Sequence, residues 1–127
     1  MFDHVQIKVA DLAACRQFYI ELLSTLGYEV VLDEEVAVGI GVNVHNMFEV
    51  SQATDEAPLS NCVHIAFVAK DADAVRRFHS TAISLGAKDN GKPDYRPIYE
   101  EGYFAAFVID PNGHNLEAVF SEKSCTP

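Results

Sequence analysis

The sequence predicts an α+β fold built from two βαβββ modules in tandem, because the chain repeats itself near its midpoint. Residues 4–11 (HVQIKVAD) align without a gap with residues 64–71 (HIAFVAKD). The match continues through pairs of arginines and phenylalanines, Arg16 with Arg76 and Phe18 with Phe78. Such a repeat defines the architecture before any single element is assigned. Each module therefore starts with a histidine on its leading strand, and the two histidines form a symmetric pair.

The first module opens with a segment, Phe2–Val9, in which apolar and polar residues alternate as in a half-buried strand. Asp11 follows as a helix N-cap, since its carboxylate can accept from the first backbone N–H groups. A helix with one apolar face is expected from Leu12 to Leu26, and Gly27 ends it as a residue that tolerates positive φ. Three short strands are expected next, at residues 28–33, 36–42 and about 46–52.

The second module repeats this order. Val63–Ala69 is rich in β-forming residues, Asp71 is again the N-cap, and the helix runs to Leu85 before Gly86. Two later strands, residues 103–109 and 114–120, are joined by Asp-Pro-Asn-Gly at residues 110–113, which is typical of a tight hairpin connection. Four strands per module would form a curved sheet, and two such sheets facing each other would enclose a cavity.

The length suits one domain spanning residues 1–127. Within it we expect module 1 at about 2–52, a linker of polar and proline composition at 53–61, module 2 at about 62–121 and a tail at 122–127.

Charge and hydropathy exclude several classes of partner. The net charge is −10, from 19 acidic and 9 basic residues, so nucleic acid and anionic membranes would be repelled. The longest apolar stretches, residues 36–42 and 104–109, are too short to span a bilayer. The first residues carry neither a basic segment nor an apolar signal core, which predicts a cytoplasmic location.

The three cysteines, Cys15, Cys62 and Cys125, are too scattered for a disulfide framework or a CxxC metal site. We expect the first two to be reduced, buried thiols.

Several motifs of the chain resemble those of a known family. The duplication, the opening at residues 3–5 (DHV) and the closing segment at 110–119 (DPNGHNLEAV) resemble the vicinal oxygen chelate superfamily, over residues 2–121. That superfamily includes glyoxalase I, bleomycin-resistance proteins and extradiol dioxygenases. Arg96-Pro97, Tyr99 and residues 103–108 (YFAAFV) resemble, more narrowly, a small bacterial glyoxalase-like subgroup.

The resemblance implies a divalent metal held by His4, His64 and Glu117. Two imidazoles and one carboxylate, with open positions, suit Fe(II), Mn(II), Ni(II) or Zn(II). Glu49 has two readings in this setting: a fourth ligand or general base, or an acidic side chain pointing to solvent from an edge strand.

Arg96, Tyr99 and Tyr103 are candidate substrate-binding residues. The guanidinium of Arg96 can hold a carboxylate or phosphate, and the tyrosines can donate from their hydroxyls. The alternative is an ordered loop whose tyrosines pack on the sheet edge. The other histidines, His45, His79 and His114, are expected to be structural.

The leading functional hypothesis is a metal-dependent lyase, isomerase or dioxygenase that acts on a small oxygenated molecule by chelation. The alternative is a metal-free binding protein of the bleomycin-resistance type, which sequesters a drug. A catalytically silent fold that serves as an interaction partner is a third hypothesis. The resemblance also implies a homodimer. The substrate, the metal, and whether the cavity lies within one chain or is shared across a dimer stay open at the level of sequence.

Overall fold

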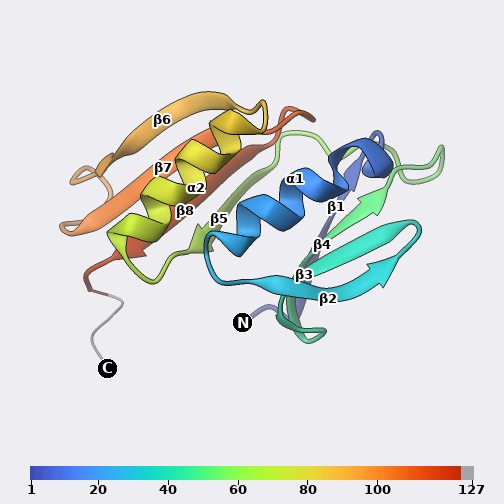
Figure 1. Cartoon of the computed structure of the whole chain (residues 1–127), viewed down its shortest axis with the longest axis horizontal. Helices are drawn as coiled ribbons and strands as arrows, with labels where there is room; N and C mark the ends of the chain where they lie inside the picture. Colours follow the sequence, from blue (N-terminus) through green and yellow to red (C-terminus); the bar gives the residue numbers. More distant parts are fainter. Residues whose placement is uncertain (124–127) are drawn as a thin grey trace. The chain divides into compact units, whose positions relative to one another are not determined.

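The computed structural model describes residues 1–123, and the chain divides into two compact units, Met1–Asn61 and a second that begins at Cys62. Each unit has the element order βαβββ, as the repeat predicted (Figure 1). Of the predicted tail, only residues 122 and 123 are among those described, and Cys125 lies outside them.

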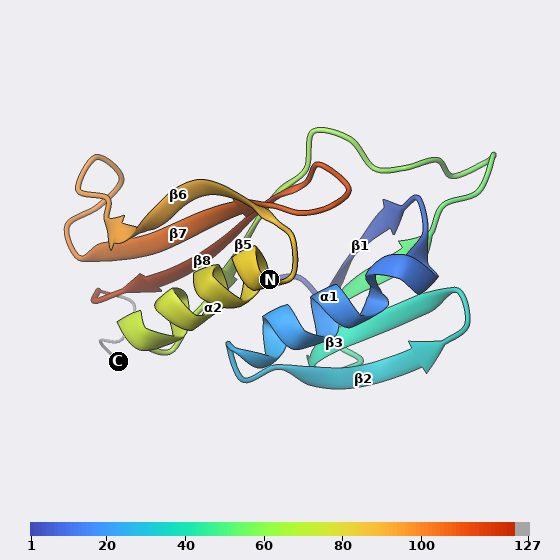
Figure 2. The same cartoon turned by 45° about the horizontal axis from the view of Figure 1, so that its top comes forward.

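The N-terminal unit is a four-stranded sheet with one helix on one face (Figures 1 and 2). Its strand order is β1-β4-β3-β2, with β1 parallel to β4 and the other pairs antiparallel. The ring of Tyr19 on the helix lies 6.2 Å from that of Phe48, so Phe48 faces the helix and Glu49 faces away. The elements are β1 His4–Val9, α1 Leu12–Ser24, β2 Glu29–Glu34, β3 Ala37–Asn43 and β4 Asn46–Gln52.

The C-terminal unit repeats this arrangement with the order β5-β8-β7-β6, in which β5 is parallel to β8. Helix α2 packs mainly on β7, β6 and β8 (Figure 2). The elements are β5 His64–Val68, α2 Ala72–Ser84, β6 Lys88–Tyr95, β7 Tyr103–Ile109 and β8 Asn115–Ser121.

Both helices have the predicted N-caps and closing glycines, although α1 ends at Ser24, two residues before the predicted Leu26, and α2 ends at Ser84, one before Leu85. The carboxylates of Asp11 and Asp71 accept from the N–H groups of Ala14 and Ala74, at 3.2 and 2.7 Å. Glycines with positive φ, Gly27 at +88° and Gly86 at +98°, follow the last turns. In α2 the N–H of Ala87 donates to the carbonyl of Ala82 at 3.0 Å, which closes a Schellman motif.

Strand β6 is the element that the sequence did not locate. Its residues, KDNGKPDY, include few β-formers, and its register against β7 shifts on both sides of Gly91. A proline is tolerated there because β6 is an edge strand of its sheet. A side chain at position 91 would approach Phe107 Cδ1 to 2.9 Å, so the glycine also permits close packing of β6 on β7.

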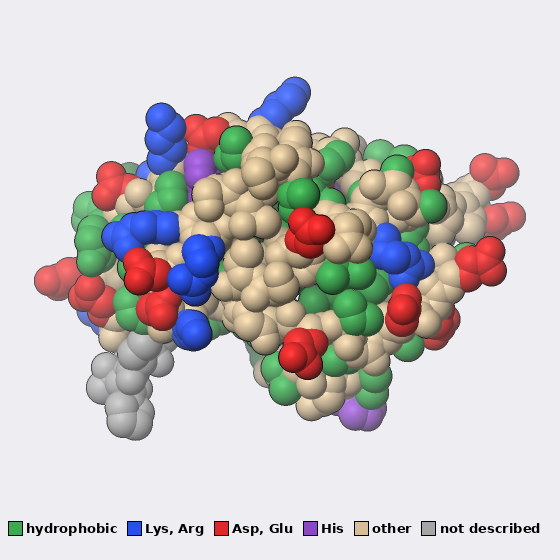
Figure 3. Space-filling view, in the orientation of Figure 1, with side chains coloured by type: hydrophobic (Ala, Val, Ile, Leu, Met, Phe, Trp, Pro, Cys, Tyr) green, Lys and Arg blue, Asp and Glu red, His purple; other side chains and the backbone are tan. Residues whose placement is uncertain are grey.

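The apolar faces predicted for the helices are buried. Phe18 and Phe78 are 6% and 0% exposed. The expectation for the cysteines is half wrong: Cys15 is buried, but Cys62 is exposed, at a positive φ of 56° where the chain enters β5. On the face drawn in Figure 3, acidic side chains are scattered over the surface. Neither helix of the described residues is long and apolar enough to cross a membrane.

Candidate functional site

The face of the C-terminal sheet that points away from α2 carries the predicted site residues of this unit. Arg76 on α2 lies over the ring of Phe104, 5.0 Å from its centroid, so Phe104 marks the helix-covered face of β7. Because side chains alternate along a strand, Tyr103 and Phe107 lie on the opposite face. The register pairs Phe107 with Glu117 on β8, and Glu117 with Ala66 on β5.

His64 and Glu117 meet on this open face. His64 Nε2 lies 2.8 Å from Glu117 Oε1. The glutamate is 2% exposed, whereas the side chain of the histidine is 53% exposed. Ala66, the register partner of Glu117, is small and leaves room for the histidine, two residues earlier on β5, to reach the carboxylate. The structure thus joins two of the three predicted metal ligands.

Tyr103 completes the surroundings of the buried carboxylate. Its hydroxyl donates a short hydrogen bond to Glu117 Oε2, and its ring stands edge-on to Tyr99, 5.4 Å between centroids. Burial raises the pKa of Tyr103, and the hydrogen bond to Glu117 raises it further, so the phenol stays protonated and acts as a donor at neutral pH. The predicted substrate-binding tyrosine therefore holds Glu117 in place.

The turn before β8 sets the position of Glu117. Asp110 is 4% exposed, and its Oδ1 accepts from the backbone N–H groups of Asn112 and His114, both at 2.8 Å. Gly113 adopts the positive φ of +87° that this connection requires. His114 is buried with Nδ1 3.3 Å from Asp110 Oδ2, so its role is structural, as expected. The DPNGH segment thereby fixes where β8 begins.

A cavity of about 390 Å³ lies on the same face. Two of the predicted substrate-binding residues, Arg96 and Tyr99, line it together with His64. Sequence reasoning did not find the remaining residues of its lining, because they lie on strands whose partners are distant in the chain. These are Asn90, Gly91, Phe107 and Asn115.

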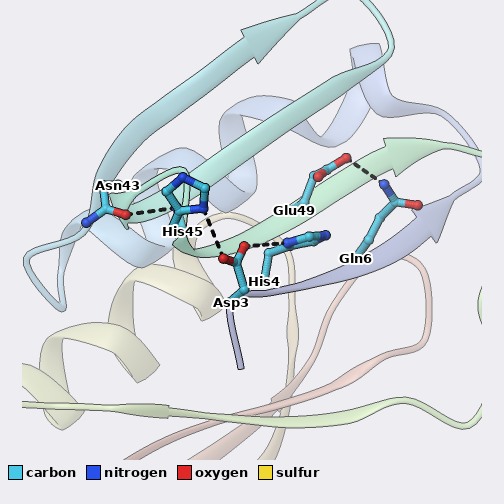
Figure 4. Close-up of polar contacts among 6 residues, drawn as sticks. All are labelled: Asp3, His4, Gln6, Asn43, His45 and Glu49. Atoms are coloured by element: carbon cyan, nitrogen blue, oxygen red, sulfur yellow. Dashed lines mark hydrogen bonds and ion pairs between the residues drawn. The ribbon is translucent and has the colours of Figure 1, made fainter. Parts of the chain in front are cut away.

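The N-terminal unit presents the other predicted site residues on β1 and β4 (Figure 4). Gln6 Nε2 donates to Glu49 Oε2 at 2.6 Å. His4 instead contacts Asp3, with Nδ1 2.8 Å from Oδ1. The second oxygen of Asp3 lies 3.0 Å from Nδ1 of His45, so one carboxylate links two imidazoles.

Asp3 determines which nitrogen of His4 is available. A carboxylate only accepts hydrogen bonds, so Nδ1 carries the hydrogen and Nε2 of the neutral ring keeps its lone pair. The hydrogen bond to Asp3 raises the pKa of His4 against the opposing effect of burial, and the charges of Asp3 and Glu49 raise it further. In turn, the hydrogen bonds from His4 and His45 lower the pKa of Asp3. Sequence reasoning missed Asp3, although it directly precedes the repeated histidine.

Glu49 and Glu117 occupy equivalent positions in the two sheets. Glu49 pairs with Gln6, two residues after His4, and Glu117 pairs with Ala66, two residues after His64. The two pairs differ in sequence separation only because the chain between strand and glutamate is longer in the second unit. The Gln6/Ala66 difference, visible in the aligned repeat, explains why only the second unit has a direct contact between histidine and glutamate.

The donor types suit a divalent metal, with two donors per unit. Within residues 1–123, no group of three or more His, Cys, Asp and Glu side chains is arranged to hold an ion. His64 Nε2 and Glu117 Oε1 do converge, and Asp3 orients His4 as a carboxylate orients a ligating imidazole. A metal at His64 would take the lone pair of Nε2, so the hydrogen of the neutral ring would lie on Nδ1.

Comparison with known proteins agrees with this architecture. The family model of the glyoxalase/bleomycin resistance protein/dioxygenase superfamily matches residues 1–118. The chain belongs to this superfamily. No curated protein matches the sequence.

Solved structures of the superfamily share the fold at low sequence identity. A glyoxalase/bleomycin resistance protein from Albidiferax ferrireducens T118 is 24% identical with a TM-score of 0.81, covering 94% of this chain and 98% of that one. A family enzyme from Burkholderia phytofirmans PsJN is 16% identical with a TM-score of 0.71 and coverages of 94% and 97%. A lactoylglutathione lyase from Agrobacterium tumefaciens is 19% identical with a TM-score of 0.65 and coverages of 94% and 92%. At these identities the likeness establishes the fold.

Proposed function

We propose that this protein is a glyoxalase-like, divalent-metal-dependent enzyme, a lyase, isomerase or dioxygenase that acts on a small oxygenated molecule. The observation that carries the proposal is the contact of His64 Nε2 with Glu117 Oε1 at 2.8 Å, beside a cavity of about 390 Å³. A cavity of this volume suits a small organic molecule. One structural neighbour is a lactoylglutathione lyase, which supports the reaction class.

The proposed ligands are His4, His64 and Glu117, with Glu49 as a fourth ligand or as a general base. Support comes from the shared register, which gives Glu49 and Glu117 the same place relative to their histidines. The ion would be Fe, Mn, Ni or Zn, because all four accept imidazole together with carboxylate. When bound, it would polarise an oxygen of the substrate as a Lewis acid.

The other side chains have roles that follow from their contacts. Tyr103 is a positioning residue, because its hydroxyl holds Glu117 Oε2. Gln6 positions Glu49 by donating to its Oε2, and the carboxylate keeps further lone pairs with which to take a proton or bind an ion. Arg96 and Tyr99 line the cavity and would contact the substrate.

The proposed assembly is a homodimer. Members of the superfamily bind small molecules and commonly form dimers. Size-exclusion chromatography with light scattering would test this assembly, and a monomer at micromolar concentration would argue against it.

The test is metal affinity in purified full-length variants. Chelator-treated wild type, His64→Ala and His79→Gln would be titrated with Mn(II), Ni(II) and Zn(II) by calorimetry. His79 is the matched control because its ring contacts Asp89, 2.9 Å away, and does not line the cavity. We expect His64→Ala to weaken binding by about 100-fold and His79→Gln to leave it unchanged. Equal affinities in all three proteins would remove His64 from the ligand set.

The second candidate is a metal-free binding protein of the bleomycin-resistance type. One observation favours it: Glu117 already has a partner on each oxygen, His64 on one and Tyr103 on the other, and so is satisfied as it stands. Wild type that takes up none of these metals but binds small molecules in the cavity would support this candidate over the enzyme.

A further inference from the structure

The cavity on the C-terminal sheet has one cationic side chain that is always charged and no acidic one. Its volume of about 390 Å³ is within the range of small-molecule sites. Among the described residues, no Asp or Glu belongs to its lining. The lining thus differs in charge from the chain as a whole, whose net charge is −10. The side chains that form the lining are His64, Asn90, Arg96, Tyr99, Phe107 and Asn115.

The main chain holds Arg96 in place. Its Nη2 donates to the carbonyl oxygen of Lys92, and also to that of Ala105 at 3.4 Å. The guanidinium carbon lies 5.5 Å from the centroid of the Phe107 ring. These contacts fix the guanidinium before any ligand arrives, which lowers the entropy that binding costs.

One donor of Arg96, Nε, is not satisfied. Its Nε is buried, and no acceptor for it exists among residues 1–123. A buried donor without a partner costs free energy, and a charged donor gains most from an anionic acceptor. The side chain is therefore bound on one edge by the protein and lacks a partner for Nε.

Phe107 connects this arginine to the proposed metal ligands. The ring of His64 lies 6.1 Å from that of Phe107, so the guanidinium and the imidazole approach the same aromatic side chain. Phe107 is also the cross-strand neighbour of Glu117. A ligand that lies against Phe107 can reach Arg96 with one end and His64 with the other.

We propose that this cavity binds small monocarboxylic acids with a planar apolar body. The carboxylate accepts from Arg96, the apolar body lies against Phe107 and Tyr99, and the far end of the molecule lies at His64. One guanidinium balances a single negative charge, and the acidic protein disfavours a dianion. Binding of such an acid does not depend on the proposed enzyme activity. That the acid is also the substrate rests on the proposed function.

The probe is mandelate, which has a carboxylate, a phenyl ring and a hydroxyl, and the comparison is mandelamide, in which a neutral amide replaces the carboxylate. Binding to full-length, ¹⁵N-labelled protein in EDTA would be followed by amide shifts of Gly91 and Asn115, both in the cavity lining. We expect mandelate to shift both signals and to bind about 10-fold or more tightly than mandelamide. Equal binding of the two compounds, or shifts at neither residue, would overturn the proposal.

Variants of the arginine test the same contact. We expect Arg96→Met to weaken mandelate binding by about 10- to 100-fold and Arg96→Lys by less, because lysine keeps the charge. Arg77→Met is the matched control, since Arg77 is exposed on α2. If Arg96→Met fails to fold, the lysine variant and the pair of probes still decide. The role of Arg96 would be refuted if Arg96→Lys bound mandelate as tightly as wild type and also bound mandelamide as tightly as mandelate.

The outcome is separable from that of the proposed function. All of these titrations are done without metal, so selective mandelate binding in a protein that never takes up metal would support the cavity and reject the enzyme. Metal uptake with no preference for mandelate over mandelamide would do the reverse.

Discussion

Replacing Tyr103 with phenylalanine isolates the hydrogen bond that holds Glu117. The ring remains and only the hydroxyl that donates to Glu117 Oε2 is lost. Because Glu117 is 2% exposed, water does not readily take the place of that donor. A hydrogen bond to a charged group contributes about 1.5–3 kcal/mol. We therefore expect Tyr103→Phe to lower the free energy of unfolding by about that amount, and with an m-value of about 1.5 kcal/mol/M to lower the urea midpoint by about 1–2 M.

The matched control is Tyr99→Phe, measured in the same urea titrations by far-ultraviolet circular dichroism. Tyr99 packs edge-on against Tyr103 but is 63% exposed. Its variant should stay within about 0.5 kcal/mol of wild type. Equal losses in the two variants, or a loss below about 0.5 kcal/mol for Tyr103→Phe, would refute the argument that this hydroxyl stabilises a buried carboxylate.

Three further predictions test packing, register and charge. Phe78→Ala should cost about 3–5 kcal/mol in urea unfolding, since the side chain is fully buried on α2, and a loss below 1 kcal/mol would contradict the assigned helix face. Gly41→Ala should cost about 1–3 kcal/mol, because the new Cβ would lie 2.3 Å from the carbonyl oxygen of Asn46; wild-type stability would contradict the β3–β4 register. The hydrogen bond from His79 lowers the pKa of Asp89 below 3.8, and a hydrogen bond from the backbone N–H of Gly91 lowers it further. The stability that the ionised carboxylate contributes is therefore present above pH 3.8 and is lost as the pH falls through the lowered pKa. The free energy of unfolding in urea should thus fall more for wild type than for Asp89→Asn between about pH 5 and pH 3. Parallel pH dependences of the two proteins would contradict this role of Asp89.

The sequence predicted most of the fold because the repeat and the helix ends are local signals. Strand β7 was placed at its observed bounds, and Asp11, Asp71, Gly27 and Gly86 cap the helices as expected. These features depend on residue type and spacing within a few positions, which sequence reasoning can use directly.

Strand β6 and the details of the site depend on contacts between distant segments. The strand forms because β7 offers backbone partners, although its own residues favour turns. The sequence proposed Tyr103 as a substrate contact, and only the fold brings its hydroxyl to Glu117. Likewise, the equivalence of Glu49 with Glu117 is hidden by unequal chain lengths and appears in the strand register.

Whether the protein holds a divalent metal ion can be measured by elemental analysis of untagged protein purified without chelator. It would be run beside the double variant His4→Ala/Glu117→Ala, which removes one proposed ligand from each unit. We expect near-stoichiometric Fe, Mn, Ni or Zn in wild type and its loss in the variant. No metal in either protein, even after reconstitution with each of the four ions, would contradict it.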